Sequence, residues 1–121
     1  MTEEILSWVR TYPGFAGVTW ESLEAQPGSM GLFSRGLEVV STTRDILGQE
    51  HRRLRLGLLL AVHTTEDTMS QTLADFAQWA VQTAPILGEN QVVKGEKGHM
   101  TRKNAHGTAR YELALTLEFT R

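Results

Sequence analysis

A histidine, an aspartate and a serine follow the most apolar segment of the chain, at His63, Asp67 and Ser70. These types can form a nucleophilic triad, in which histidine takes the serine proton and a carboxylate orients the histidine. Asp67 and Ser70 also lie where a helix is expected to begin, and both residue types are common caps there. Because no feature of the sequence supplies an oxyanion site, we favour the capping role and assign no catalytic residue.

The histidines do not follow a metal-binding pattern. His51 and His63 share one side of an expected strand, but the rise of a strand separates them by about 40 Å. His99 and His106 would meet only if their segment folds back, and solvated loop histidines are the simpler interpretation. The sequence contains no cysteine and no glycine-rich phosphate loop with its lysine. We therefore predict no metal, no cofactor and no enzymatic activity.

The one concentration of charge is basic. Its members are Arg44, Arg52, Arg53 and Arg55. We rank three roles for it, in this order: a solvated hairpin partly neutralised by Asp45 and Glu50, salt bridges to a neighbouring subunit, and contact with a nucleic-acid backbone. No aromatic residue lies among these arginines to stack on bases, which argues against single-strand recognition.

The composition indicates one domain. The chain has 121 residues and a net charge of −2, which predicts nothing about partners. The absence of cysteine fits a reducing compartment, or an assembly stabilised by subunit contacts. The first ten residues include Glu3 and Glu4 and lack the basic start of a signal peptide, so we expect no signal peptide. The longest apolar run, residues 56–62, is much shorter than the roughly 20 residues that cross a membrane.

Residues 54–62 predict the central strand. Leucine or valine occupies every even position, from Leu54 to Val62, so these side chains form one apolar face of a strand. Extended from His51 to His63, this strand is about 43 Å long. A domain of this size has a radius of gyration of only about 14 Å. We therefore expect its first part to project as a charged hairpin, which a neighbouring subunit can contact.

Two amphipathic segments predict helices. The first begins at Thr2, which we expect to cap it, and ends before Pro13. The second begins at residues 65–68, with hydroxyl and carboxylate caps, and ends near Pro85. Its apolar stripe should cover the even face of the central strand. Trp79 lies at the edge of this stripe, either at the rim of the core or in a contact with another chain.

The remaining segments predict strands and loops. We expect strands at residues 18–23, 37–43, 90–94 and 111–119, with a short extended piece at 30–33 and a turn at 35–36. Residues 95–106 predict a mobile loop that carries Lys97, Arg102 and Lys103. The predicted fold is a single α+β domain over residues 1–121. It comprises an antiparallel sheet of about four to five strands, two helices packed on one face, and a long projecting β-hairpin.

Several short motifs occur in a characteristic order along nearly the whole chain. They are Trp8, Tyr12-Pro13-Gly14, Pro27-Gly28-Ser29, Arg44-Asp45-Ile46-Leu47-Gly48 and Gly107-Thr108-Ala109-Arg110-Tyr111. This succession resembles the small minor capsid or tail-terminator proteins encoded by prophages and tailed phages of Gram-positive bacteria.

The resemblance implies a virion assembly protein, present in the host cytoplasm before assembly. Such α+β subunits form a ring, commonly a hexamer, that caps the tail tube and joins it to the head. The implied partners are further copies of the chain and tail-tube or head-completion proteins, and DNA would pass only through the ring lumen. The competing hypothesis is a monomeric or dimeric ligand- or nucleic-acid-binding α+β module.

A head-to-tail ring needs two different surfaces on each subunit. The candidates for the subunit or tube interface are the hairpin at 42–55 and the loop at 95–106. Their basic residues are Arg44, Arg52, Arg53, Arg55, Lys97, Arg102 and Lys103. We expect that glutamate at Arg52, Arg53 and Arg55 would leave a folded monomer that forms no ring.

Overall fold

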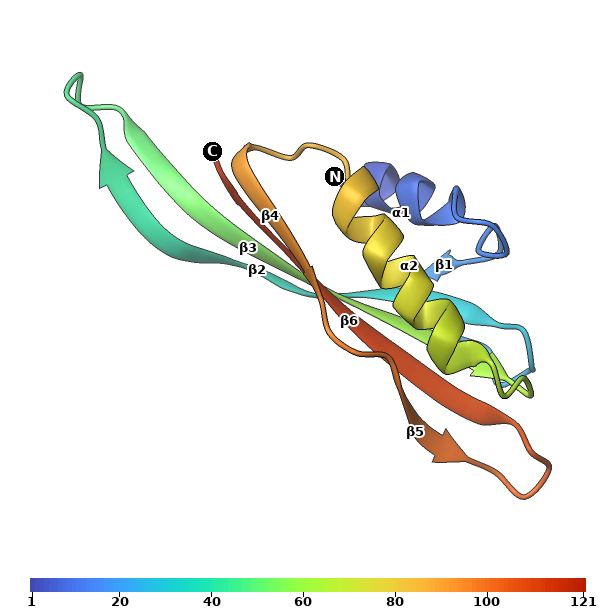
Figure 1. The fold of residues 1–121 in the computed structure, drawn as a ribbon. Coiled ribbons are helices and arrows are strands. Elements are labelled where there is room, and N and C mark those ends of the chain that lie inside the picture. Colours follow the sequence, from blue (N-terminus) through green and yellow to red (C-terminus); the bar gives the residue numbers. More distant parts are fainter.

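A computed structural model of the protein describes all 121 residues, which form two helices and a six-stranded, mostly antiparallel sheet (Figure 1). The elements are α1 (Thr2–Arg10), β1 (Thr19–Trp20), β2 (Met30–Arg44), β3 (Glu50–Thr64), α2 (Met69–Thr83), β4 (Glu89–Gly95), β5 (His99–Lys103) and β6 (Ala109–Thr120). The predicted α+β class is confirmed, but the sheet has one or two strands more than predicted. Neither helix is long and apolar enough to cross a membrane.

Strand β3 is the centre of the sheet, as residues 54–62 predicted. It pairs antiparallel with β2 on one side and with β6 on the other. Leu56, Leu58 and Leu60 are buried, and they pair with the buried odd-numbered residues of β6. We call this side of the sheet the core face. The odd-numbered residues of β3 and the even-numbered residues of β6 lie on the opposite face.

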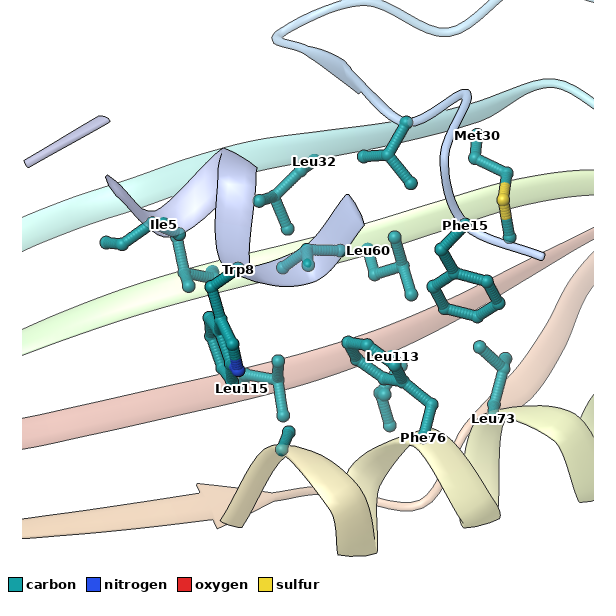
Figure 2. Packing of buried hydrophobic residues seen from close by; sticks show 14 of the residues in the cluster. Ile5, Trp8, Phe15, Met30, Leu32, Leu60, Leu73, Phe76, Leu113 and Leu115 are labelled. Carbon is teal, nitrogen blue, oxygen red and sulfur yellow. The ribbon is translucent and has the colours of Figure 1, made fainter. Parts of the chain in front are cut away.

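Both helices contribute side chains to the buried cluster on the core face (Figure 2). The Phe76 ring lies 4.8 Å from Phe15, 5.2 Å from Tyr12 and 5.6 Å from Trp79, measured between ring centroids. Trp79 also stacks on Trp8 at 5.8 Å. Trp79 is therefore partly buried at the rim of the core, the first of the two positions that the sequence left open.

Strands β4 and β5 follow one another along the same edge of β6. β4 pairs with residues 115–120 of β6, and β5 pairs with residues 109–112. The predicted strand at 90–94 is confirmed, but the prediction of a loop over 95–106 is wrong because this segment contains β5. The sequence did not indicate β5 because all its side chains are exposed, so they lack an apolar alternation.

Strand β2 is continuous where the sequence predicted a turn at Arg35-Gly36. The register with β3 shifts by one residue between Ser34 and Gly36, and Gly36 has a φ of +106°. Glycine adopts this conformation easily, so the strand accommodates a β-bulge and continues.

The strand predicted at residues 18–23 is reduced to Thr19–Trp20, which pairs parallel with β2. The chain leaves the sheet at Glu21, whose φ is +54°. The Glu21 carboxylate instead accepts a hydrogen bond from the Ser34 amide at 2.8 Å.

The predicted side-chain caps are also wrong at both helices. Helix α1 already includes Thr2, and neither helix has a side-chain cap hydrogen bond. Before α2, the Thr64 hydroxyl accepts a hydrogen bond from the Glu66 amide at 3.0 Å, which forms a turn upstream of the helix. The helices therefore depend on their buried faces more than on their caps.

Candidate functional site

Strands β2 and β3 pair from Met30–Val62 at one end to Arg44–Glu50 at the other, and Asp45–Gln49 connect them. We call residues 37–55 of these two strands and their connection the arm. Its β2 half is exposed throughout. The outer edge of β2 is unpaired beyond Leu32, because β1 reaches only Gly31 and Leu32. The arm therefore has a row of backbone donors and acceptors that no other strand of this chain uses.

The four predicted arginines of the arm are all paired within the chain. Arg44 and Arg52 lie 3.8 Å and 2.8 Å from Glu50. Arg55 contacts Glu38 on β2 at 2.8 Å. The basic group that stands out in the sequence is thus largely neutralised by nearby carboxylates, one of them on the same strand as its arginine.

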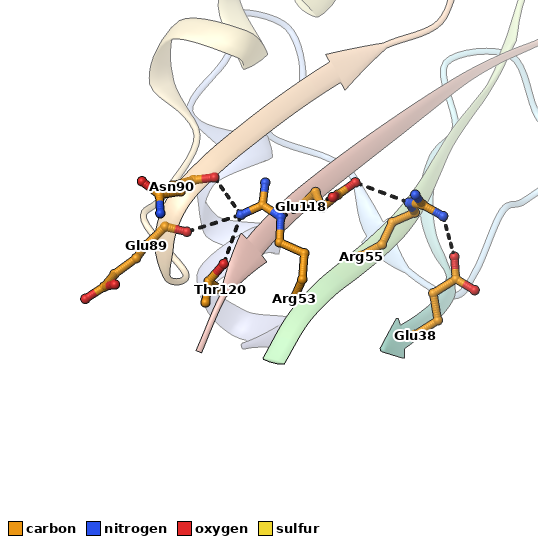
Figure 3. A network of polar contacts seen from close by, with 7 residues as sticks. All are labelled: Glu38, Arg53, Arg55, Glu89, Asn90, Glu118 and Thr120. Carbon is orange, nitrogen blue, oxygen red and sulfur yellow. Dashed lines mark hydrogen bonds and ion pairs between the residues drawn. The ribbon is translucent and has the colours of Figure 1, made fainter. Parts of the chain in front are cut away.

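Arg53 and Arg55 belong to a polar network on the opposite face that spans four strands (Figure 3). Arg53 donates to Glu118 at 3.1 Å and to the Asn90 carbonyl at 2.7 Å, and so connects β3 to β6 and β4. Arg55 lies 3.4 Å from the other oxygen of Glu118. The hydrogen bond from Arg53 lowers the pKa of Glu118, since it stabilises the carboxylate. The hydrogen bond to Glu38 correspondingly raises the pKa of Arg55.

At the end of the arm, Asp45 organises the connection between β2 and β3. Its carboxylate accepts hydrogen bonds from the Leu47 and Gln49 amides at 2.9 and 3.0 Å, and it lies 3.0 Å from His51. The hydrogen bond with His51 is the largest cause of the lowered pKa of Asp45. This ordered turn leaves Ile46 and Leu47 exposed, at 101% and 81%.

Apolar residues continue along β2 from the core face. Leu37 pairs with Leu56 and Val39 pairs with Leu54, so both lie on the same side of the sheet as the buried leucines. Leu37 is nevertheless 51% exposed and Val39 53%. Together with Val40, Ile46 and Leu47 they form what we call the apolar strip of the arm. The sequence predicted an interface at the hairpin 42–55, which includes Ile46 and Leu47, but on account of its arginines and not of these apolar residues.

A second apolar surface lies beside β4, which pairs only with β6 and so has a free outer edge. The exposed residues here are Val81 near the end of α2, Ile86 in the following loop and Val92 on β4. They border an open hollow of about 550 Å³. We call this surface the β4 groove.

The other predicted interface residues lie away from the arm. Lys97 is exposed in the connection between β4 and β5, while Arg102 and Lys103 lie on β5. β5 pairs with residues 109–112 of β6, whereas Arg53 of the arm pairs with Thr120 at its other end. The structure thus separates the predicted basic residues into two groups at opposite ends of β6.

The residues of the possible triad do not form a reactive constellation. His63 Nδ1 hydrogen-bonds to the carbonyl of Glu24, and His63 lies on the opposite face, while Asp67 and Ser70 belong to the approach to α2 and its first turn. No group of three or more histidine, aspartate or glutamate side chains is placed to hold a metal ion.

Comparison with known proteins gives no relative: no protein-family model and no curated protein matches the chain.

Proposed function

We propose that this chain is a virion assembly protein, a tail terminator or minor capsid protein, whose copies form a ring at the junction of tail and head. The observation that carries the proposal is the arm, with its unpaired strand edge and its exposed apolar strip. Several exposed apolar side chains along one strand and its turn, in a protein with a separate buried core, favour an interaction site. Its role is assembly rather than catalysis.

In the proposed subunit, both helices cover the core face and the long hairpin projects past them. This proposal is supported by the length of the β2–β3 pairing, which continues beyond the last buried residues of β2. The course of the two strands relative to α1 and α2 can be followed in Figure 1. β6 accompanies β3 as far as Arg53, and Arg121 bonds to the backbone of Arg52, so only the part of the arm beyond Arg52 consists of β2 and β3 alone. Such a two-stranded ribbon is at best marginally stable in water without a further partner. We therefore propose that the arm is covered by a neighbouring subunit in the assembled state.

The two surfaces required for a head-to-tail ring are, in this proposal, the arm and the β4 groove. Each combines a free strand edge with exposed apolar side chains, so strand addition can supply hydrogen bonds while the apolar residues supply burial. The β4 groove replaces the predicted loop at 95–106 as the second surface. Lys97, Arg102 and Lys103 remain candidates for contact with the tail tube.

The apolar strip, rather than the arginines, provides the clean test of the interface. Arg53 and Arg55 hold the sheet network together, so replacing them with glutamate would place acids beside Glu118 and Glu38 and would disturb the fold itself. A triple glutamate variant at Arg52, Arg53 and Arg55 would therefore test the sheet network as well as the interface. Ile46 and Leu47 are almost wholly exposed and can be changed without loss of core contacts.

We expect that Ile46→Asp with Leu47→Asp leaves the subunit folded and abolishes ring formation, because carboxylates are costly to bury in an apolar interface. Size-exclusion chromatography with light scattering measures the mass, and circular dichroism verifies the fold. Thr65→Asp with Ser70→Asp is the matched control, since it adds the same charge at exposed positions near the start of α2, where acids are tolerated. Rings formed by the Ile46/Leu47 variant would exclude the arm tip from the interface.

The alternative function is a monomeric or dimeric ligand- or nucleic-acid-binding module. The observation that favours it is a polar hollow of about 270 Å³ lined by His63, Arg102 and Arg110, among others. A wild-type mass of one or two subunits at the highest soluble concentration would favour this alternative over the ring.

A further inference from the structure

Three basic side chains lie in one row across three neighbouring strands. In the sheet register, His63 of β3 is opposite Arg110 of β6, and Arg110 is opposite Arg102 of β5. All three lie on the opposite face, away from the buried cluster. Like charges directly opposite one another destabilise a sheet, so the facing pair of Arg110 and Arg102 calls for a compensating group.

Elsewhere on the same face, the sheet compensates its charges. Glu38 of β2 is opposite Arg55 of β3, and Arg55 is opposite Glu118 of β6. That row alternates acid, base and acid, and its members make ion pairs of 2.8 and 3.4 Å. The row of His63, Arg110 and Arg102 has no acid between its members, and Arg102 makes no ion pair within the chain. The nearest carboxylate is Glu112, 3.5 Å from Arg110 Nε.

The three residues border a hollow that is suited to a small anion. Its volume is about 270 Å³, and its lining is completed by Ala25, Asn104 and Thr108. Asn104 Oδ1 accepts hydrogen bonds from the His106 and Thr108 amides at 2.9 and 3.0 Å, which leaves its NH₂ group as a donor. His63 Nδ1 donates to the Glu24 carbonyl, so the neutral ring borders the hollow without offering it an N–H donor, and the donors to an anion are Arg102, Arg110 and Asn104.

We propose that this hollow is an oxyanion site that binds a phosphate group between Arg102 and Arg110. Each guanidinium presents a planar fork of N–H donors that fits two phosphate oxygens, and the bound charge removes the repulsion between the two arginines. Asn104 adds a neutral donor from the β5–β6 turn. The phosphate is either free or part of a nucleic-acid backbone. The site is independent of ring formation, because all its residues belong to one subunit.

Titration calorimetry of the full chain with inorganic phosphate, at constant ionic strength with chloride as the reference anion, tests the site. We expect one phosphate per chain, and at least about a tenfold loss of affinity in Arg102→Gln and in Arg110→Gln. Lys103→Gln is the matched control, because it removes the same charge one position along β5, where the side chain faces the other way. Arg102 is exposed, so its substitution leaves the fold intact.

A short DNA duplex distinguishes the two sources of phosphate. Duplex binding that Arg102→Gln weakens and Lys103→Gln retains assigns a backbone phosphate to the site, whereas binding of inorganic phosphate alone assigns a free anion. Equal losses in Arg102→Gln and Lys103→Gln would show that only diffuse charge attracts the anion, and would overturn the site. Absence of binding by both probes would overturn it as well.

Discussion

At the scale of single residues, the ion pairs between Arg53, Arg55 and Glu118 lie on the face of the sheet opposite the core face. Glu118 forms ion pairs with both Arg53 and Arg55, and these contacts join strands that are far apart in the sequence. Because the hydrogen bond from Arg53 lowers the pKa of Glu118 in the folded state, the carboxylate stabilises the fold only while it is ionised.

The stability of the protein should consequently fall in acid. A carboxyl group with a lowered folded-state pKa contributes stability above its unfolded-state value, about 4.3 for glutamate. That contribution is lost as the pH falls from there through the folded-state pKa. Urea unfolding between pH 7 and pH 3 should show a smaller loss for Glu118→Gln than for wild type. Glu66→Gln, at an exposed position, is the control and should follow wild type. Parallel curves for all three proteins would contradict a stabilising role for ionised Glu118.

At the scale of elements, close backbone approach positions α2 against the outer strands. Gly98 lies in the connection between β4 and β5, and a Cβ added there would lie 2.7 Å from Leu73 Cβ of α2. Leu73 is fully buried. Gly98 therefore allows the chain to pass beneath the helix as it turns from β4 into β5, where the sequence indicated only a loop.

Gly98→Ala should destabilise the protein by about 1–3 kcal/mol, since the added methyl group overpacks a site bounded by a buried side chain. The measurement is the urea midpoint, with an unchanged dependence on denaturant. Gly17→Ala is the matched control: a Cβ there has no atom within 4 Å, so the variant should be neutral or slightly stabilised. Equal effects at both positions would show that the close approach to Leu73 is unimportant.

At the scale of the whole molecule, the chain has a well-packed half and an exposed half. The buried residues of β3 and β6 belong to one cluster with residues of both helices, whereas residues 34–44 of β2 are exposed throughout. Backbone hydrogen bonds that are exposed to solvent and covered by few apolar contacts open easily. The proposed ring would remove this asymmetry by placing a neighbouring subunit on the arm.

Hydrogen exchange followed by mass spectrometry should resolve the two halves. In the isolated subunit, amides of residues 34–44 should exchange much faster than those of residues 56–62. On assembly, protection should rise at residues 34–47 and at β4, because these are the proposed contact surfaces. Protection that rises only elsewhere would contradict the proposed pair of surfaces.

The local sequence pattern was sufficient to identify the helix and strands in which apolar and polar residues recur with a regular period. The even-numbered leucines of β3, the odd-numbered apolar residues of β6 and the stripe of α2 each reflect burial on one side, so period alone identified them. The α+β class followed from their order. Pattern failed at β5 and at the bulge near Gly36, where exposed strands carry no periodic signal.

The placement of charge was decided largely by tertiary structure. Sequence proximity grouped Arg44, Arg52, Arg53 and Arg55 as one basic surface with Glu50 as a partial neutraliser, but only strand pairing supplies Glu118 and Glu38 to Arg53 and Arg55. The same pairing places His63 beside Arg110 and Arg102, although His63 is far from them along the chain, and it leaves Arg102 without an acidic partner. Hydrophobic period is a local property that the sequence determines by itself. The partner of a charged side chain depends on sheet register, which is fixed only when distant segments pair.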